Sequence, residues 1–172
     1  MRFFYILFLI FFIGCSNKVY VIWKNNMKNT HIQKINKTIG INLQIPEYML
    51  SGNFVEIKKN KLIYLNEEIP QIPKNFFENY LISKLNNNLK CNIREYPWDF
   101  TNKKPYKIYF IKIEDFYKKS DFYVLNYLLN NKYFSLKRRY KKNGFKKIFN
   151  LMINNIENII KKDCKWKNFF LG

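Results

Sequence analysis

The residues best suited to chemistry in this chain are its three cysteines. Cys15 directly follows the small residue Gly14, at the end of an unbroken apolar run over residues 3–13. A peptidase that removes an export signal cleaves after a small residue at the end of such a run. The thiol of Cys15 would then stand directly after the cleavage point, where it is nucleophilic enough to accept a diacylglyceryl group. We therefore expect cleavage before Cys15 and a covalent lipid on its sulfur.

The apolar run has the length of a secretory signal. A helix needs about 20 apolar residues to cross a bilayer core of about 30 Å, and this run is shorter and follows one positive residue, Arg2. The stretch 12–15 (FIGC) resembles the lipobox that bacterial lipoprotein signal peptidases recognise, with Phe12 where leucine is commoner. Stable anchoring takes more than one acyl chain. The sequence predicts a signal over residues 1–14 and a mature chain anchored by lipid on Cys15; the alternative is an ordinary signal or anchor with an incidental cysteine.

The two other cysteines, Cys91 and Cys164, are a candidate disulfide. An envelope compartment permits disulfide formation, and the Cα atoms of a bonded pair lie about 6 Å apart. The alternative is two unpaired thiols, with Cys91 packed as a small hydrophobe and Cys164 near the C-terminus. The sequence alone does not decide between them.

No motif for catalysis or metal binding occurs elsewhere in the sequence. It contains no glycine-rich phosphate loop, HExxH helix, paired-cysteine metal motif or nucleophile elbow. The single histidine, His31, has no cluster of metal-binding residues beside it. Asp99, Glu114 and Asp115 lack a histidine or third acid nearby with which to share acid–base work. We expect a protein that is not an enzyme and carries no metal or cofactor apart from the lipid on Cys15.

The chain is strongly basic, with 31 Lys and Arg against 12 Asp and Glu among 172 residues and a formal net charge of +19. Such an excess is typical of nucleic-acid binding, but export would remove the chain from nucleic acid. Codons rich in A and T also favour lysine, so most of these lysines are expected to be solvated. Beside a membrane, anionic lipid head groups are the better partners, because each Lys or Arg near an anionic leaflet contributes about 1 kcal/mol.

The mature chain is predicted to begin with a tether over residues 15–37, which is polar and rich in lysine. Within it, the apolar cluster 19–23 is only a weak candidate for an edge strand. Residues 38–172 are predicted to form a single domain with a real core. Apolar alternation predicts a strand over 38–45, which Pro46 ends.

The rest of the chain predicts further strands and two main helices. We expect a hairpin of residues 54–57 and 61–65, a helix over 74–87, a short strand over 91–95, a meander of 106–116, 122–129 and 133–140, and a helix from 145 to 160. The apolar stripe of the last helix is expected to pack on the sheet. The fold class is therefore α/β or α+β, with a mixed sheet of about five to seven strands packed with two main helices.

Short motifs behind Cys15 follow one another in a characteristic order: Ile39-Gly40, Leu43, residues 45–50 (IPEYML), 54–57 (FVEI), 60–62 (NKL), 81–85 (LISKL) and Tyr96-Pro97-Trp98. This series resembles the ABC-type transport auxiliary lipoproteins, the PqiC-like intermembrane transport lipoproteins, whose members have a similar YPW motif. The resemblance runs from Ile39 to the last helix. The chain departs from the family at residues 66–70 (NEEIP), where family members usually carry a tryptophan.

The resemblance implies a non-enzymatic envelope component. Its expected partners are an MCE-type protein and the ABC transporter components with which it would move phospholipids or other apolar molecules between two membranes. The chain would act as a docking or ring-forming piece, and so as a candidate homo-oligomer, with no nucleic acid bound. Ser16 after the lipidated cysteine, in place of the aspartate associated with inner-membrane retention, favours the outer membrane, facing the periplasm, over the inner membrane.

The candidate interface is formed by Tyr96, Pro97 and Trp98. Proline fixes a rigid turn, and large aromatic side chains anchor protein interfaces; the alternative is that Trp98 caps the core of the sheet. Other functions stay open: an accessory lipoprotein of lipopolysaccharide or secretion machinery, or a direct lipid carrier, which would need a sizeable apolar pocket. Nucleic-acid binding would use a further set of cations, Lys137-Arg138-Arg139, Lys141-Lys142 and Lys146-Lys147.

Overall fold

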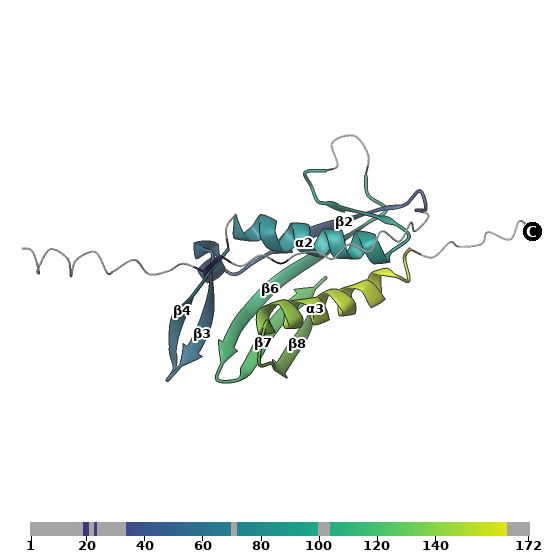
Figure 1. Ribbon diagram of the computed structural model, residues 1–172. Helices are drawn as coiled ribbons and strands as arrows, with labels where there is room; N and C mark the ends of the chain where they lie inside the picture. The colour runs from purple at the N-terminus through teal and green to yellow at the C-terminus, as the bar shows by residue number, and fades with distance from the viewer. Residues whose placement is uncertain (1–18, 21–22, 24–33, 70–71, 100–103, 165–172) are drawn as a thin grey trace, which may run out of the picture.

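The computed structural model describes residues 19–20, 23, 34–69, 72–99 and 104–164. In this part of the chain, two long helices lie on one face of a mixed sheet of eight strands, one of which has only two residues (Figure 1). In chain order the elements are β1 (Val19–Tyr20), β2 (Thr38–Gln44), the 3₁₀ helix η1 (Glu47–Ser51), β3 (Asn53–Lys58), β4 (Lys61–Glu68), α2 (Pro73–Asn88), β5 (Asn92–Glu95), β6 (Lys107–Lys119), β7 (Phe122–Leu129), β8 (Lys132–Arg139) and α3 (Gly144–Ile160).

The long strand β6 organises the sheet. Its first half pairs in parallel with β2, and its last residues pair in parallel with β3 on the same edge. Its other edge pairs with β7, which in turn pairs with β8, and both of these pairings are antiparallel. The strands β5 and β4 lie outside β2 and β3, and β1 lies outside β4. The two helices therefore have a broad surface on which to pack.

The inward residues of β6 follow the period of a strand. Tyr109, Ile111 and Ile113 are buried at alternate positions. A bulge between Ile113 and Asp115 shifts the alternation by one residue, so Phe116 also faces the core. The same strand can therefore support both helices along its length.

The core between sheet and helices is rich in aromatic rings. The rings of Phe54 and Phe145 stack with their centroids 4.2 Å apart, and Phe149 contacts Phe77 and Phe116. The buried residues of α3 recur every three or four positions: Phe145, Ile148, Phe149, Met152, Ile153, Ile156 and Ile160. The prediction that this stripe packs on the sheet is confirmed.

Within the predicted tether over residues 15–37, the structure describes residues 19–20, 23 and 34–37, and several of these contact the domain. Trp23 is buried, and its ring centroid lies 5.1–6.0 Å from those of five core aromatic residues, Phe54, Phe76, Phe77, Tyr80 and Phe149. The backbone of Val19–Tyr20 pairs in parallel with β4, and Ile35 is also buried. Burying a large aromatic side chain is worth more than leaving it in water. Val19–Tyr20, Trp23 and Ile35 therefore contribute to the fold, and the first three lie in the apolar cluster 19–23 that was a weak candidate for an edge strand.

The predicted fold class is confirmed, and the bounds of its elements differ by only a few residues. The strand β7 has the predicted bounds, whereas β4 and β6 each extend three residues further than the sequence pattern indicated. The first long helix begins at Pro73, a favourable first residue because proline lacks only an N–H that the helix would leave unpaired there. Neither helix in the described ranges is long and apolar enough to cross a membrane.

Candidate functional site

The turn that carries Tyr96, Pro97 and Trp98 follows β5 and is held against β2. The N–H of Tyr96 donates to the carbonyl of Ile41 across 2.7 Å, and the side-chain amide of Asn42 donates to the carbonyl of Tyr96 across 3.0 Å. At the far end of the turn, the carboxylate of Asp99 accepts the N–H of Glu95. These bonds fix the turn to the sheet although its side chains lie at the surface.

Trp98 is an exposed side chain, with 71% of its surface accessible. The alternative that Trp98 caps the core is therefore wrong. Tyr96 is partly buried and meets the ring of Phe110, which is itself exposed, edge to face at 6.4 Å between centroids. The turn and the neighbouring part of β6 thus present aromatic surface to the outside, a feature that marks interaction sites more often than ordinary surface.

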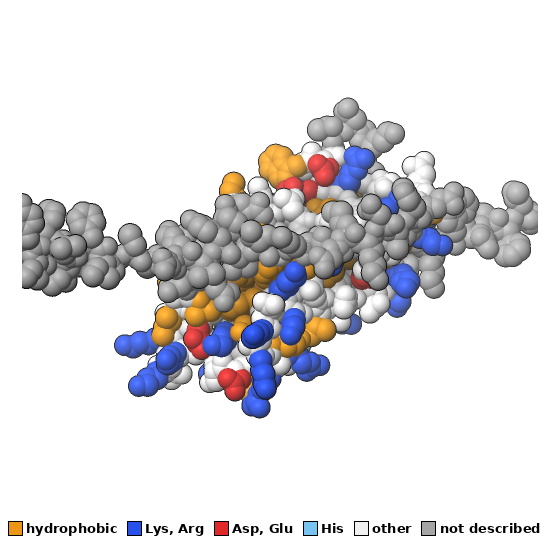
Figure 2. Space-filling view, viewed as in Figure 1, with side chains coloured by type: hydrophobic (Ala, Val, Ile, Leu, Met, Phe, Trp, Pro, Cys, Tyr) orange, Lys and Arg blue, Asp and Glu red, His pale blue; other side chains and the backbone are white. Residues whose placement is uncertain are grey.

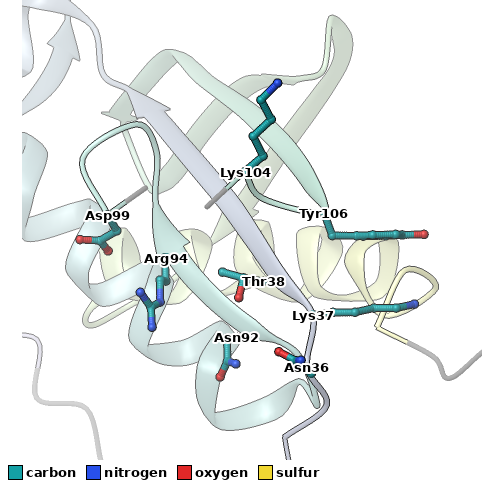
Figure 3. A pocket seen from close by; sticks show the side chains of 8 residues that line it. All are labelled: Asn36, Lys37, Thr38, Asn92, Arg94, Asp99, Lys104 and Tyr106. Atoms are coloured by element: carbon teal, nitrogen blue, oxygen red, sulfur yellow. The ribbon is translucent and has the colours of Figure 1, made fainter. Parts of the chain in front are cut away.

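A polar pocket of about 410 Å³ lies where β2 and β5 begin, and its lining residues are Asn36, Lys37, Thr38, Asn92, Arg94, Asp99, Lys104 and Tyr106 (Figure 3). The ammonium group of Lys37 lies 4.7 Å from the centroid of the Tyr106 ring. Arg94 and Lys104 form no ion pair within the described residues. This lining differs from the apolar cavity that a lipid carrier would need.

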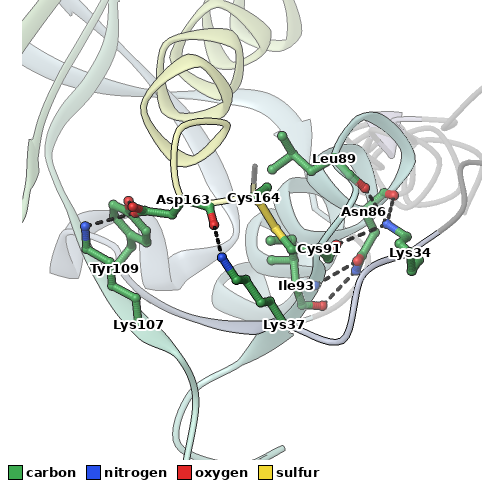
Figure 4. The surroundings of a disulfide bond; sticks show 10 residues. All are labelled: Lys34, Lys37, Asn86, Leu89, Cys91, Ile93, Lys107, Tyr109, Asp163 and Cys164. Atoms are coloured by element: carbon green, nitrogen blue, oxygen red, sulfur yellow. Dashed lines mark hydrogen bonds and ion pairs between the residues drawn. A yellow bond between two sulfur atoms is a disulfide. The ribbon is translucent and has the colours of Figure 1, made fainter. Parts of the chain in front are cut away.

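Cys91 and Cys164 form a disulfide with a Cα–Cα distance of 5.3 Å (Figure 4). Both residues are buried, and the bond joins the residue just before β5 to the chain just after α3. Disulfides persist in oxidising compartments. The bond therefore suggests that the chain resides outside the cytoplasm.

The surroundings of the disulfide are held by hydrogen bonds from both sides. The side-chain amide of Asn86 accepts the N–H of Ile93 across 2.9 Å and donates to its carbonyl across 2.7 Å. The ammonium group of Lys34 donates to the carbonyl of Leu89 across 2.7 Å and to that of Asn86 (Figure 4). These bonds hold the C-terminal end of α2 against β5, next to the disulfide.

A small polar network joins Asp163, just beyond the end of α3, to β6. The carboxylate of Asp163 accepts hydrogen bonds from the ammonium group of Lys107, at 2.9 Å, and from the hydroxyl of Tyr109. Burial alone would raise the pKa of Asp163, but the hydrogen bonds from Tyr109 and Lys107 lower it. Burial and the bond to Asp163 raise the pKa of Tyr109 to about 12. The network ties the end of the chain segment that follows α3 to β6.

Glu78 of α2 is a buried carboxylate that the sequence patterns did not single out. It is 1% exposed and accepts the N–H of Leu43 across 3.2 Å. Burial raises its pKa to about 7, with the nearby Glu95 adding to the effect and Lys74, 3.4 Å away, opposing it. The only sequence signal for this residue was its spacing of four positions from Lys74, which is common on exposed helices.

The remaining predicted site residues fall into two groups. Cys15 and His31 lie outside the described residues. The cations of the nucleic-acid hypothesis lie on β8, on the connection to α3 and on the first turn of α3. Lys137 and Arg139 of β8 lie over the ring of Phe122, at 4.8 and 4.9 Å from its centroid.

Comparison with known proteins shows similarity in fold alone. No protein-family model and no curated protein matches the sequence. Protein XCC0632 from Xanthomonas campestris, described as DUF330, has a similar structure with a TM-score of 0.60 and 9% identity, over 84% of this chain and 95% of that one. A second solved structure, of an uncharacterized protein, gives a TM-score of 0.56 and 12% identity, over 86% of this chain and 99% of the other.

Proposed function

We propose that this chain is a lipid-anchored lipoprotein of the bacterial envelope that serves an ABC/MCE-type intermembrane lipid transport system as a non-enzymatic docking subunit. The observation that carries the proposal is the similarity in fold to the DUF330 protein over most of both chains. DUF330 is the family of PqiC-like lipoproteins, which the motifs at residues 45–50 and 96–98 also resemble. A lipobox-like sequence at Cys15 is what such a protein requires.

The anchor would be lipid on Cys15, with the domain in the periplasm at the outer membrane. The disulfide between Cys91 and Cys164 supports this part of the proposal, because it needs an oxidising compartment. Ser16 supports the outer over the inner membrane. The predicted signal over residues 1–14 supplies the export step.

The packing inside the domain favours a docking role over a role as a lipid carrier. The layer between sheet and helices is filled by the rings of residues such as Phe54, Phe77, Phe116 and Phe149, which contact one another directly. The pocket beside β5 is polar. Trp98, by contrast, is an exposed aromatic side chain on a turn fixed to the sheet, which is the arrangement of an interface anchor.

Site-specific crosslinking in intact cells tests this function. A photoreactive phenylalanine analogue replaces Trp98 in one tagged strain and Tyr133, an exposed aromatic residue of β8, in a matched control. We expect an MCE-type protein to be recovered from position 98 and much less from position 133. Recovery of lipopolysaccharide or secretion components instead, with no transporter component, would refute the transport role.

The anchor needs a separate test. Labelled palmitate should enter the full chain and should not enter a Cys15→Ser variant. Labelling that persists in the variant would contradict lipidation at this residue while leaving the crosslinking result intact.

A further inference from the structure

One end of the sheet carries an unusual concentration of positive charge. We call it the basic end, and define it as the turn between β3 and β4, the turn between β6 and β7, and the end of β8 with its connection to α3. Its cations are Lys58, Lys59, Lys61, Lys118, Lys119, Lys137, Arg138, Arg139, Lys141 and Lys142. Within residues 56–62, 117–123 and 136–143 the acids are Glu56 and Asp121, and Glu56 is already paired with Lys118 at 3.1 Å.

The strand register brings these separate segments together. Ile57 of β3 lies beside Lys119 of β6, Lys119 lies beside Phe122 of β7, and Phe122 lies beside Arg139 of β8. These residues form one row across the sheet at the end where the β3–β4 and β6–β7 hairpins turn (Figure 1). In the space-filling view, Lys and Arg side chains gather over the same end (Figure 2). The basic end is therefore a continuous surface.

Apolar side chains are interleaved with these cations. Leu62 and Tyr64 of β4 are about half exposed, and they pair with Ile57 and Val55 on the sheet face opposite the helices. Phe122 lies under two cations, Lys137 and Arg139. Cations that surround shallow apolar groups are the composition of a surface that lies on a bilayer, where the charges meet phosphates and the apolar groups reach the acyl boundary.

We infer that the basic end rests on an anionic membrane surface and binds the phosphates of lipid head groups. The cations come from separate segments that together form a broad end of the molecule. A broad basic surface is complementary to a flat, negatively charged membrane. Each Lys or Arg near such a surface strengthens binding about fivefold. The three segments acting together would then fix the orientation of the domain on the bilayer.

Lysine footprinting of the purified full chain tests the inference. The protein is mixed with vesicles of phosphatidylcholine, with or without phosphatidylglycerol, and treated with a membrane-impermeant acylating reagent. We expect lysines of the basic end to be protected several-fold only when phosphatidylglycerol is present, and to regain reactivity in high salt. Three lysines at the other end, Lys90, Lys161 and Lys162, are exposed and should react equally in all samples.

A pair of matched triple variants sharpens this test. Lys59→Gln with Lys119→Gln and Lys142→Gln removes one exposed cation from each segment, and at about fivefold per residue should weaken the contact about a hundredfold. Three lysines left unchanged in the basic end, Lys58, Lys61 and Lys141, should then lose their protection. In the control variant, Lys90, Lys161 and Lys162 are changed to Gln. Its net charge equals that of the first variant, and the lysines of its basic end should stay protected.

The opposing outcomes are distinct. The membrane contact would be overturned if lysines of the basic end reacted equally with both kinds of vesicle. It would also be overturned if both triple variants lost protection to the same extent. Protection by duplex DNA or by polyglutamate, but not by phosphatidylglycerol, would assign the basic end to another partner and also overturn it. Failure to attach to phosphatidylcholine vesicles at all would count against the lipid anchor, while protection by phosphatidylglycerol would still decide the role of the basic end.

Discussion

The carboxylate of Glu78 in α2 accepts the backbone N–H of Leu43 in β2 across 3.2 Å. The pairing of β2 with β5 ends at Ile41 and Glu95, so the N–H of Leu43 extends beyond its neighbouring strand. An unpaired buried N–H costs about 1–3 kcal/mol, and Glu78 supplies the missing acceptor. The helix therefore completes the edge of the sheet where β5 turns away toward Trp98.

This contact predicts a pH dependence of stability. The carboxyl pKa is about 7 in the folded state against an ordinary value of 4.5. Below pH 4.5 both states hold the proton, and between 4.5 and 7 only the unfolded state releases it, so the contribution of Glu78 to stability falls as pH rises through this window. Above pH 7 the loss is complete.

Glu78→Gln should therefore stabilise the protein at pH 8 and have little effect at pH 4. Glutamine keeps an acceptor for Leu43 without the buried charge. One pKa unit corresponds to about 1.4 kcal/mol, so the rise from 4.5 to about 7 predicts a gain of about 3 kcal/mol at pH 8. Urea unfolding at both values measures it, with Glu47→Gln, at an exposed position, as the control. An equal effect of Glu78→Gln at the two pH values would contradict the assignment.

The disulfide predicts a large loss of stability when it is removed. Cys91 and Cys164 are 73 positions apart, and closing a loop of that size in the unfolded chain is worth about 4 kcal/mol. A double change to alanine, and reduction of the parent protein, should lower the free energy of unfolding by similar amounts in denaturant titrations. Alkylation of the denatured, unreduced protein should label neither thiol. Labelling of both would show that they are unpaired.

Local patterns in the sequence predicted most of the fold. The period of α3 from Phe145 to Ile160 and the aromatic run of β7 each specify their own element, because one face of each is buried. The same reasoning did not predict the burial of Trp23 among core rings or the buried carboxylate of Glu78, since their partners come from distant elements. The pairing of Cys91 with Cys164 depends equally on the approach of β5 and the end of α3, which no local signal contains.

Replacement by alanine should affect stability very differently at Trp23 and at Trp98. Trp23→Ala removes a ring packed among core aromatic residues and should cost about 3–5 kcal/mol of stability. Trp98→Ala removes an exposed ring and should change stability by less than about 0.5 kcal/mol. Denaturant unfolding of both variants measures the contrast. If Trp98→Ala lowered the free energy of unfolding more than Trp23→Ala did, the exposed position of Trp98 and its use as a surface anchor would be contradicted.

The first residue of α3, Gly144, lies against the ring of Tyr123 in β7. A Cβ placed on Gly144 would come 2.1 Å from that ring, so the ring must move to admit it. The same ring packs edge to face on Phe145, with centroids 4.9 Å apart, which restricts that movement. Gly144→Ala should therefore cost about 1–3 kcal/mol through overpacking, although alanine is the better helix former.

A double-mutant cycle separates these two effects of Gly144→Ala. In a Tyr123→Ala background the ring is absent, so the same substitution should become neutral or stabilise the protein by up to about 1 kcal/mol through helix propensity. Unfolding free energies of the four proteins give the coupling between the two positions. An unchanged cost of Gly144→Ala in the Tyr123→Ala background would show that the backbone at the start of α3, and not the approach of the ring, requires glycine there.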